Sequence, residues 1–493
     1  MHESSTPPAD ATTRGTRPGV IIGLLVVSAF VMILNETIMS VALPVLIGEL
    51  GVTATTVQWL TSGFLLTMAV VIPTTGYLLQ RFSPRQVYLA AMTLFITGTL
   101  ICALSPGFGM LLAGRVVQAG GTAMMIPLVM TTVMTLVPEN RRGAMMGNIS
   151  LVIAVAPAIG PMVGGVILGA LDWPWMFWIV LPLALIMLAL GYRLMRLNSA
   201  NEPGPLDVPS VLLSAVGFSG IVYGFSALGA AAQGGAAMPP WIPLGVGVLG
   251  LAAFITRQLK LQHRGHALLD LRPFTHRRFV VMVILGALLF MCLLGAGAVL
   301  LPLYLQGTLG VGPRATGLAV LPGGLIMGLL GRPVGWLYDR IGARPLVIPG
   351  SIAVATAMWL FVVLGEDTSL GAVIAVHILL MSGLGLMMTP LMTDSLSVLS
   401  NELYSHGSAI MATLQQVAGA AGTAAFVAVS AMAASGGPES GGGTGMQAGF
   451  IAAGIVGLLA VATALFVPRK ARSSGPTPPV DDHAEPLEVP AAR

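Results

Sequence analysis

Long apolar runs alternate with short polar turns along almost the whole chain. Each run continues for about 20 residues, the length of an α-helix that crosses a bilayer, and lacks the two-residue alternation of a membrane β-strand. The pattern therefore predicts an all-α polytopic membrane protein. We place fourteen transmembrane helices at residues 19–45, 54–79, 86–104, 109–135, 143–168, 174–195, 208–228, 240–260, 278–305, 315–338, 345–364, 370–395, 407–432 and 447–467.

Charge supports this class and orients the helices. Only 9% of the 493 residues are charged, against about a quarter in soluble domains. Basic residues collect in the turns on one side, which marks the cytoplasm, whereas Arg314 lies on the other side. We expect a multi-pass protein of the cytoplasmic membrane with both termini in the cytoplasm. Because the basic residues are scattered among membrane turns, we expect membrane lipid and no nucleic acid as a partner.

Few residues suit metal or enzyme chemistry. Cys102 and Cys292 lie inside apolar runs and have no metal-type spacing. The sequence has no His-Glu-x-x-His motif, Walker loop or nucleophile elbow. We therefore expect no metal site, no cofactor and no enzyme activity.

Two turns on the basic side share a pattern. GYLLQRFSPRQV begins at Gly76 and GWLYDRIGARPL begins at Gly335, and the same offset of 259 residues carries Gly51 onto Gly310. The matched pairs are Gly76/Gly335, Leu78/Leu337, Arg81/Arg340 and Arg85/Arg344. Internal duplication is typical of secondary transporters, in which two bundles rock about a central site. Chance is the alternative, because any tight turn on the cytoplasmic side favours glycine and arginine.

The repeat and the composition divide the chain into five parts. Residues 19–196 and 278–468 are each predicted to form a six-helix bundle. Residues 197–277 are predicted to hold a two-helix insert and a basic cytoplasmic linker. The Pro/Ser/Thr-rich segments 1–18 and 469–493 are predicted to be disordered cytoplasmic tails.

Glu36 interrupts the first apolar run within the stretch MILNETIMSVALP. An ionised acid inside a membrane costs several kcal/mol unless it is paired or hydrated, so Glu36 is a candidate proton carrier and substrate-binding residue. A cationic compound and a proton could compete for this carboxylate. The neighbouring Asn35 could hold the carboxylate by a hydrogen bond and is a second candidate for substrate binding. The alternative is a structural glutamate bonded between helices.

Arg115 is the only basic residue deep in the fourth predicted helix. Since its guanidinium does not readily lose its charge, it must meet an acid, water or backbone carbonyls. Gln118, three residues further on the same helix face, could complete this network and contact substrate. A purely structural ion pair is the alternative.

Four motifs together resemble those of a known family. The Gly-x-Leu-x-x-Arg-x-x-x-Arg turn, LLAGRVVQAGG, APAIGPMVGG and LNETIMSVALP resemble motifs A, B, C and D1 of the major facilitator superfamily. The helix count and the Asn-Glu pair resemble its fourteen-helix drug/proton antiporter branch. The resemblance implies two six-helix bundles plus two extra helices, with export driven by the proton gradient. It also implies that Arg115 tunes the acid in the first helix, here Glu36.

The resemblance assigns conformational roles to two regions. Motif C, which includes Gly160, Pro161 and Gly164, is associated with exporters, although plain helix packing explains these residues physically. In motif A an aspartate forms a charge-paired latch. Asp339 keeps that residue in the second copy of the turn, whereas the first copy has Gln80. The conformational candidates at the turns are Gly76, Arg81, Arg85, Gly335, Asp339, Arg340 and Arg344.

Four further polar residues lie in the twelfth and thirteenth predicted helices. Asp394 is a second candidate for proton coupling, with a solvated acid at a helix end as the alternative. His377 could titrate during transport, but it is favoured as a hydrogen-bonded packing residue. Gln415 and Gln416 are candidate substrate contacts, with hydrogen bonding between helices as the alternative.

These observations predict a proton-coupled secondary transporter that works by alternating access. It would export amphipathic or cationic small molecules as a monomer. A dedicated exporter of one metabolite, lipid or antibiotic, and a membrane sensor that transports nothing, stay open as alternatives.

Overall fold

The computed structural model describes residues 18–52, 54–57, 59–195, 207–232, 238–263, 267–434 and 442–468. Both predicted tails lie outside these residues, apart from Pro18, which begins the first helix. Fourteen helical runs in the described part are long and apolar enough to cross a membrane, which confirms the predicted number. The bounds of the five predicted parts stay predictions.

Helices form every regular element of the described part. The N-terminal bundle contains α1 (Pro18–Leu50), α2 (Ala54–Val57), α3 (Trp59–Arg81), α4 (Pro84–Ala103), α5 (Phe108–Leu136), α6 (Arg142–Ala170) and α7 (Trp175–Leu194). The insert contains α8 (Val208–Ala232) and α9 (Trp241–Gln262). The C-terminal bundle contains α10 (Arg277–Phe290), α11 (Leu301–Leu303), α12 (Pro313–Ile341), α13 (Arg344–Val363), α14 (Leu370–Ser397), α15 (Tyr404–Ala434) and α16 (Gly442–Leu465).

The run that begins with α10 is not a regular α-helix throughout. Residues Met291–Leu300 and Tyr304–Thr308 have π-helical turns on either side of α11. The sequence gives no signal for this change, because the apolar pattern continues through both segments.

The internal repeat is visible in the backbone. Gly51 and Gly310, which are 259 residues apart, have φ angles of 63° and 64°. A left-handed residue at both positions requires glycine, so the same turn ends the first transmembrane run of each bundle.

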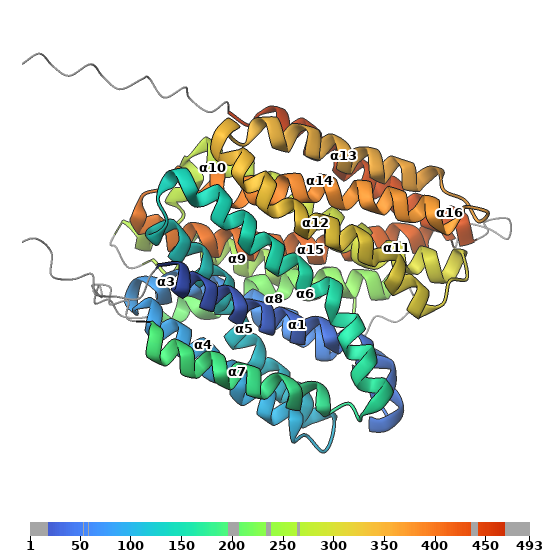
Figure 1. The fold of residues 1–493 in the computed structure, drawn as a ribbon, viewed down its shortest axis with the longest axis horizontal. Helices are drawn as coiled ribbons and strands as arrows, with labels where there is room; N and C mark the ends of the chain where they lie inside the picture. The colour runs from blue at the N-terminus through green and yellow to red at the C-terminus, as the bar shows by residue number, and fades with distance from the viewer. Residues whose placement is uncertain are drawn as a thin grey trace, which may run out of the picture.

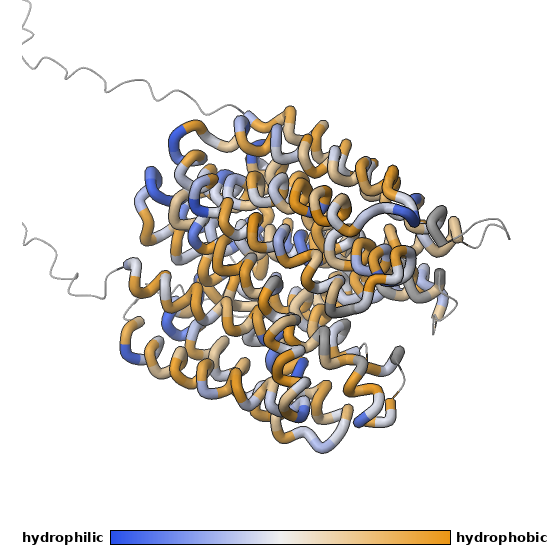
Figure 2. Tube along the Cα trace, turned by 45° about the vertical axis from the view of Figure 1, so that its right-hand side comes forward, coloured by the Kyte–Doolittle hydropathy of each residue, from blue (hydrophilic) through white to orange (hydrophobic). Residues whose placement is uncertain are grey.

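The basic residues of the turns lie together at one end of the helices, which we call the arginine-rich end. Arg81 ends α3, Arg142 begins α6, Arg278 lies in the first turn of α10, and Arg344 begins α13. Figure 2 shows hydrophobic residues along the lengths of the helices and hydrophilic residues mainly near their ends. This distribution matches the one that a bilayer requires.

The two bundles share a hydrophobic core at the arginine-rich end. One buried cluster joins Val133 and Met146 of the N-terminal bundle to Leu396 and Ile410 of the C-terminal bundle. Two other clusters each belong to a single bundle, one around Leu46 and the other formed by residues of α10 to α16 and their connections. Helices α6 and α12 lie side by side across this junction, as Figure 1 shows.

The insert packs against both bundles. Helix α8 contacts α3 of the N-terminal bundle and α15 of the C-terminal bundle, and α9 packs along α8. Glycines permit this tight pair, since a Cβ at Gly220 would lie only 2.6 Å from the Cα of Gly247. On the α3 side, the rings of Trp59 and Tyr223 stack with centroids 5.8 Å apart.

Candidate functional site

Glu36 and Arg115 lie on the contacting helices α1 and α5. Arg115 is 1% exposed, whereas Glu36 is partly exposed. The two charges are near enough to interact electrostatically, but among the described residues no ion pair or hydrogen bond joins them. Nor does a hydrogen bond from the described residues reach the Glu36 carboxylate. The site therefore combines a buried fixed cation with a nearby acid that has no partner in the described protein.

Gln118 of its own helix α5 and groups on α1 and α3 hold Arg115. Its Nη1 donates to Oε1 of Gln118 at 2.8 Å and, at 3.5 Å, to Oδ1 of Asn35. Its Nε donates to the Leu60 carbonyl oxygen at 3.4 Å. Gln118 in turn donates from Nε2 to Oγ1 of Thr99 at 2.8 Å. The structure thus brings together the predicted residues Asn35, Arg115 and Gln118.

Close helix packing explains how α4 reaches this network. A Cβ at Gly98 would overlap the backbone nitrogen of Gln118, and one at Gly114 would lie 2.6 Å from the sulfur of Cys102. The absence of side chains at these glycines lets α4 and α5 approach closely. Thr99 can therefore reach Gln118 on α5.

The glycines of the fifth predicted helix hold α1 in place beside the site. A Cβ at Gly160 would overlap Thr37, and one at Gly164 would lie 3.1 Å from the carbonyl oxygen of Ile38. Thr37 also donates to the Ala156 carbonyl oxygen at 3.4 Å. Thr37 directly follows Glu36, so the contact of α6 with α1 fixes the backbone that carries the acid. The predicted conformational role of these glycines, and of Pro161 in the same helix, stays a prediction.

Comparison with known proteins identifies the family. The profile of the Major Facilitator Superfamily matches residues 25–423. This chain belongs to the major facilitator superfamily. Lincomycin resistance protein LmrB of Bacillus subtilis (strain 168) is 41% identical over 415 residues, which cover 84% of this chain and 85% of that protein. A multidrug resistance protein B homolog of Mycobacterium tuberculosis (strain ATCC 25618 / H37Rv) is 28% identical over 406 residues, which cover 82% of this chain and 74% of that protein.

Solved structures agree with the fold of this superfamily. The human organic anion transporter MFSD10 has a TM-score of 0.66 and 17% sequence identity, and the match covers 93% of this chain and 100% of that one. The proton:xylose symporter XylE has a TM-score of 0.63 and 17% identity, with 92% and 96% covered. Membership of this family of transporters confirms the prediction that the chain is not an enzyme.

The two copies of the superfamily turn make contacts at equivalent positions across the bundle junction, although one side chain accepts hydrogen bonds and the other donates one. In the second copy, Asp339 accepts hydrogen bonds from the backbone amides of Gly143 and Ala144 at 2.8 and 2.9 Å. In the first copy, Gln80 donates from Nε2 to the Glu402 carbonyl oxygen at 2.8 Å. The offset is 259 residues on both sides, since 339 − 80 and 402 − 143 give the same number. Because it accepts from the first amides of α6, Asp339 binds the N-terminus of that helix, where the helix dipole favours an anion.

The other turn candidates lie at the same end. A Cβ at Gly76 would lie 2.7 Å from Nδ1 of His406, and one at Gly335 would overlap the Gly143 carbonyl oxygen. The Arg85 guanidinium lies 5.1 Å from the ring centroid of Tyr192, and that of Arg340 lies 3.6 Å from that of Trp336. Arg81 ends α3 and Arg344 begins α13. Their conformational roles stay predictions.

Asp394 pairs with a different arginine, Arg278, and is buried. It is 1% exposed and forms an ion pair with Arg278, with N–O distances of 2.5 and 2.7 Å. The Tyr338 hydroxyl also donates to it at 3.1 Å. This burial contradicts the alternative of a solvated acid at a helix end, while its role in proton coupling stays a prediction.

The remaining candidates on α14 and α15 do not join the Arg115 network in the described structure. His377 is 3% exposed, and its Nδ1 lies against Gly323 without a hydrogen-bond partner among the described residues. Gln415 is 9% exposed, and Gln416 makes a long contact of 3.9 Å from Nε2 to the sulfur of Met68. The predicted contact of Gln415 and Gln416 with substrate stays untested.

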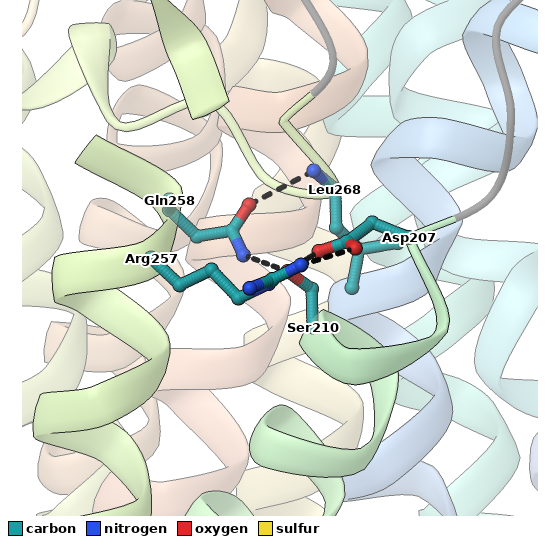
Figure 3. A network of polar contacts seen from close by, with 5 residues as sticks. All are labelled: Asp207, Ser210, Arg257, Gln258 and Leu268. Carbon is teal, nitrogen blue, oxygen red and sulfur yellow. Dashed lines mark hydrogen bonds and ion pairs between the residues drawn. The ribbon is translucent and has the colours of Figure 1, made fainter. Parts of the chain in front are cut away.

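A second network of polar contacts joins the two helices of the insert, as Figure 3 shows. Arg257 of α9 donates from Nε and Nη2 to the two carboxylate oxygens of Asp207, each at 2.7 Å. Gln258 donates to Ser210 at 2.7 Å and accepts from the backbone amide of Leu268 at 2.8 Å. The network ties α8 and α9 to the segment that leads into α10 of the C-terminal bundle.

Proposed function

We propose that this protein is a proton-coupled exporter of amphipathic small molecules and that Glu36 carries the proton. The observation that carries this proposal is the position of Glu36 inside a membrane-capable helix, beside the buried charge of Arg115 and without a hydrogen bond or ion pair from the described residues. An acid in such a place is costly when ionised, so binding a proton or a cation lowers its energy. A proton and a cationic compound would therefore compete for Glu36, and this competition couples their movements.

Alternating access would come from rocking of the two bundles. The shared core and the contacts of Asp339 and Gln80 close the arginine-rich end. We assign this end to the cytoplasm because Lys and Arg concentrate in cytoplasmic loops. On this assignment we propose that the described state opens to the outside and that both termini lie in the cytoplasm. The proton gradient supplies the energy, so no cofactor is required.

The names of the relatives guide the choice of substrates. Lincomycin resistance protein LmrB and the multidrug resistance protein B homolog support antibiotics and other amphipathic compounds as cargo. We propose lincomycin as the first compound to test, with a panel of cationic amphiphiles beside it.

Growth of a drug-sensitive bacterial host tests this function. We expect expression of the wild-type chain to raise several-fold the lincomycin concentration, or that of another panel compound, needed to stop growth. Glu36→Gln should remove this protection at equal membrane abundance, because glutamine cannot exchange a proton. Protection that is identical with both chains would contradict the role of Glu36, and no protection against any compound would contradict multidrug export.

A further inference from the structure

The ring of Phe64 covers one face of the Arg115 guanidinium. The Arg115 Cζ lies 4.1 Å from the ring centroid, and both side chains are 1% exposed. At this distance the negative face of an aromatic ring attracts a cation, and the attraction is stronger when both groups are removed from water. Phe64 is therefore an electrostatic partner of the cation as well as an apolar neighbour.

Polar groups hold Arg115 in the plane of its guanidinium while Phe64 covers the face. The in-plane acceptors are Gln118 at 2.8 Å, the Leu60 carbonyl oxygen at 3.4 Å and Asn35 at 3.5 Å. Leu60 and Phe64 lie one turn apart on α3, so this helix supplies both an acceptor and the ring. No carboxylate among the described residues forms an ion pair with Arg115. The ring thus supplies stabilisation that an ion pair would otherwise give.

The ring itself is fixed by a small apolar cluster. Its other members are Met68, Ile72, Ala119, Ala123 and Ala412. Ala412 belongs to α15, so residues of both bundles hold the ring in position. The distance of 4.1 Å between the Arg115 Cζ and the ring centroid leaves no room for a water molecule between the two groups.

We propose that Phe64 is a positioning residue that keeps the Arg115 charge desolvated and directed at Glu36, and so sets the pH range in which Glu36 exchanges its proton. This inference rests on the proposed function of Glu36. Without the ring, water would reach the guanidinium and screen its charge. The Glu36 carboxylate would then receive less stabilisation and would keep its proton to higher pH.

The test is the pH dependence of binding of a fluorescent cationic compound, ethidium, to the purified full-length protein. We expect Phe64→Leu to move the pH midpoint of binding upward by about half to one unit, because a screened guanidinium stabilises the ionised Glu36 carboxylate less. Phe64→Trp, which keeps an aromatic face, should restore the wild-type midpoint. The matched control is Phe177→Leu, because Phe177 is also 1% exposed and belongs to a different apolar cluster, and no guanidinium of the described residues lies over its ring.

The outcomes separate this inference from the proposed function. An unchanged midpoint in Phe64→Leu, or an equal shift in Phe177→Leu, would overturn the positioning role. Wild-type protein that binds ethidium independently of pH, or Glu36→Gln with an unchanged pH dependence, would overturn the proposed function and this inference with it. Thermal unfolding of each variant shows whether it is folded, and Phe64→Trp supplies the comparison if Phe64→Leu does not fold.

Discussion

At the scale of single residues, Asp207 lies just before α8 and outside the membrane-capable helices. The hydrogen bonds from Arg257 hold the pKa of the Asp207 carboxyl below its ordinary value. A group whose pKa is lower in the folded state stabilises that state above its unfolded pKa of about 4. The stabilisation is lost as the pH falls through the folded pKa.

We therefore expect Asp207→Asn to unfold at a lower temperature than the wild type at pH 7. The difference between the two melting temperatures should begin to shrink below about pH 4 and should disappear only once the pH has fallen through the lowered pKa of the folded carboxyl. Thermal unfolding of both proteins in detergent over a pH series measures this. A difference that is equally large at pH 7 and in acid would show that the charge of Asp207 does not stabilise the insert.

The sequence predicted Asn35, Glu36, Arg115 and Gln118 but neither Phe64 nor Thr99. Glu36 and Arg115 stand out because a charged residue in an apolar run is costly and therefore rare. Phe64 carries no such signal, since an aromatic residue is ordinary in a membrane helix. Its contact with Arg115 depends on which face of α3 turns toward α5, and the apolar pattern of α3 does not determine that face. Thr99 was missed for the same reason on α4.

At the scale of elements, α6 uses two glycine pairs against two partners. Gly143 and Gly147 lie against α12, whereas Gly160 and Gly164 lie against α1. Helix packing was already a sufficient explanation of the motif C glycines from the sequence, but no pattern indicated that the first half of the same helix contacts the other bundle. Helix α6 is therefore the element that connects the Glu36 region to the bundle junction.

Substitution at this junction tests the importance of the helix crossing. A Cβ at Gly147 would overlap the Gly331 carbonyl oxygen, whereas a Cβ at Gly165 of the same helix meets no atom within 4 Å. We expect Gly147→Ala to destabilise the described state by about 1–3 kcal/mol, the usual cost of overpacking, and to reduce transport. Gly165→Ala should leave both unchanged. Equal melting temperatures and transport rates for the two variants would contradict the close crossing of α6 and α12.

At the scale of the whole molecule, the duplication was readable from the sequence because glycine and arginine positions keep one offset. The same offset relates the contact of Gln80 to that of Asp339, although the side chains differ. The position of the insert was not readable. Its helices have the apolar composition of any membrane helix, and only the structure places α8 between α3 and α15.

The central claim is that loss and gain of a proton at Glu36 drives exchange between the two sides of the membrane. Its direct test is transport of a labelled compound into proteoliposomes with an imposed pH gradient. The compound is one against which the wild-type chain protects cells. Glu49→Gln is the matched control, because Glu49 lies on the same helix but is exposed at its end. We predict that the wild type and Glu49→Gln exchange compound for protons and that Glu36→Gln loses gradient-driven flux. Glu36→Gln with the wild-type rate of exchange would contradict the account.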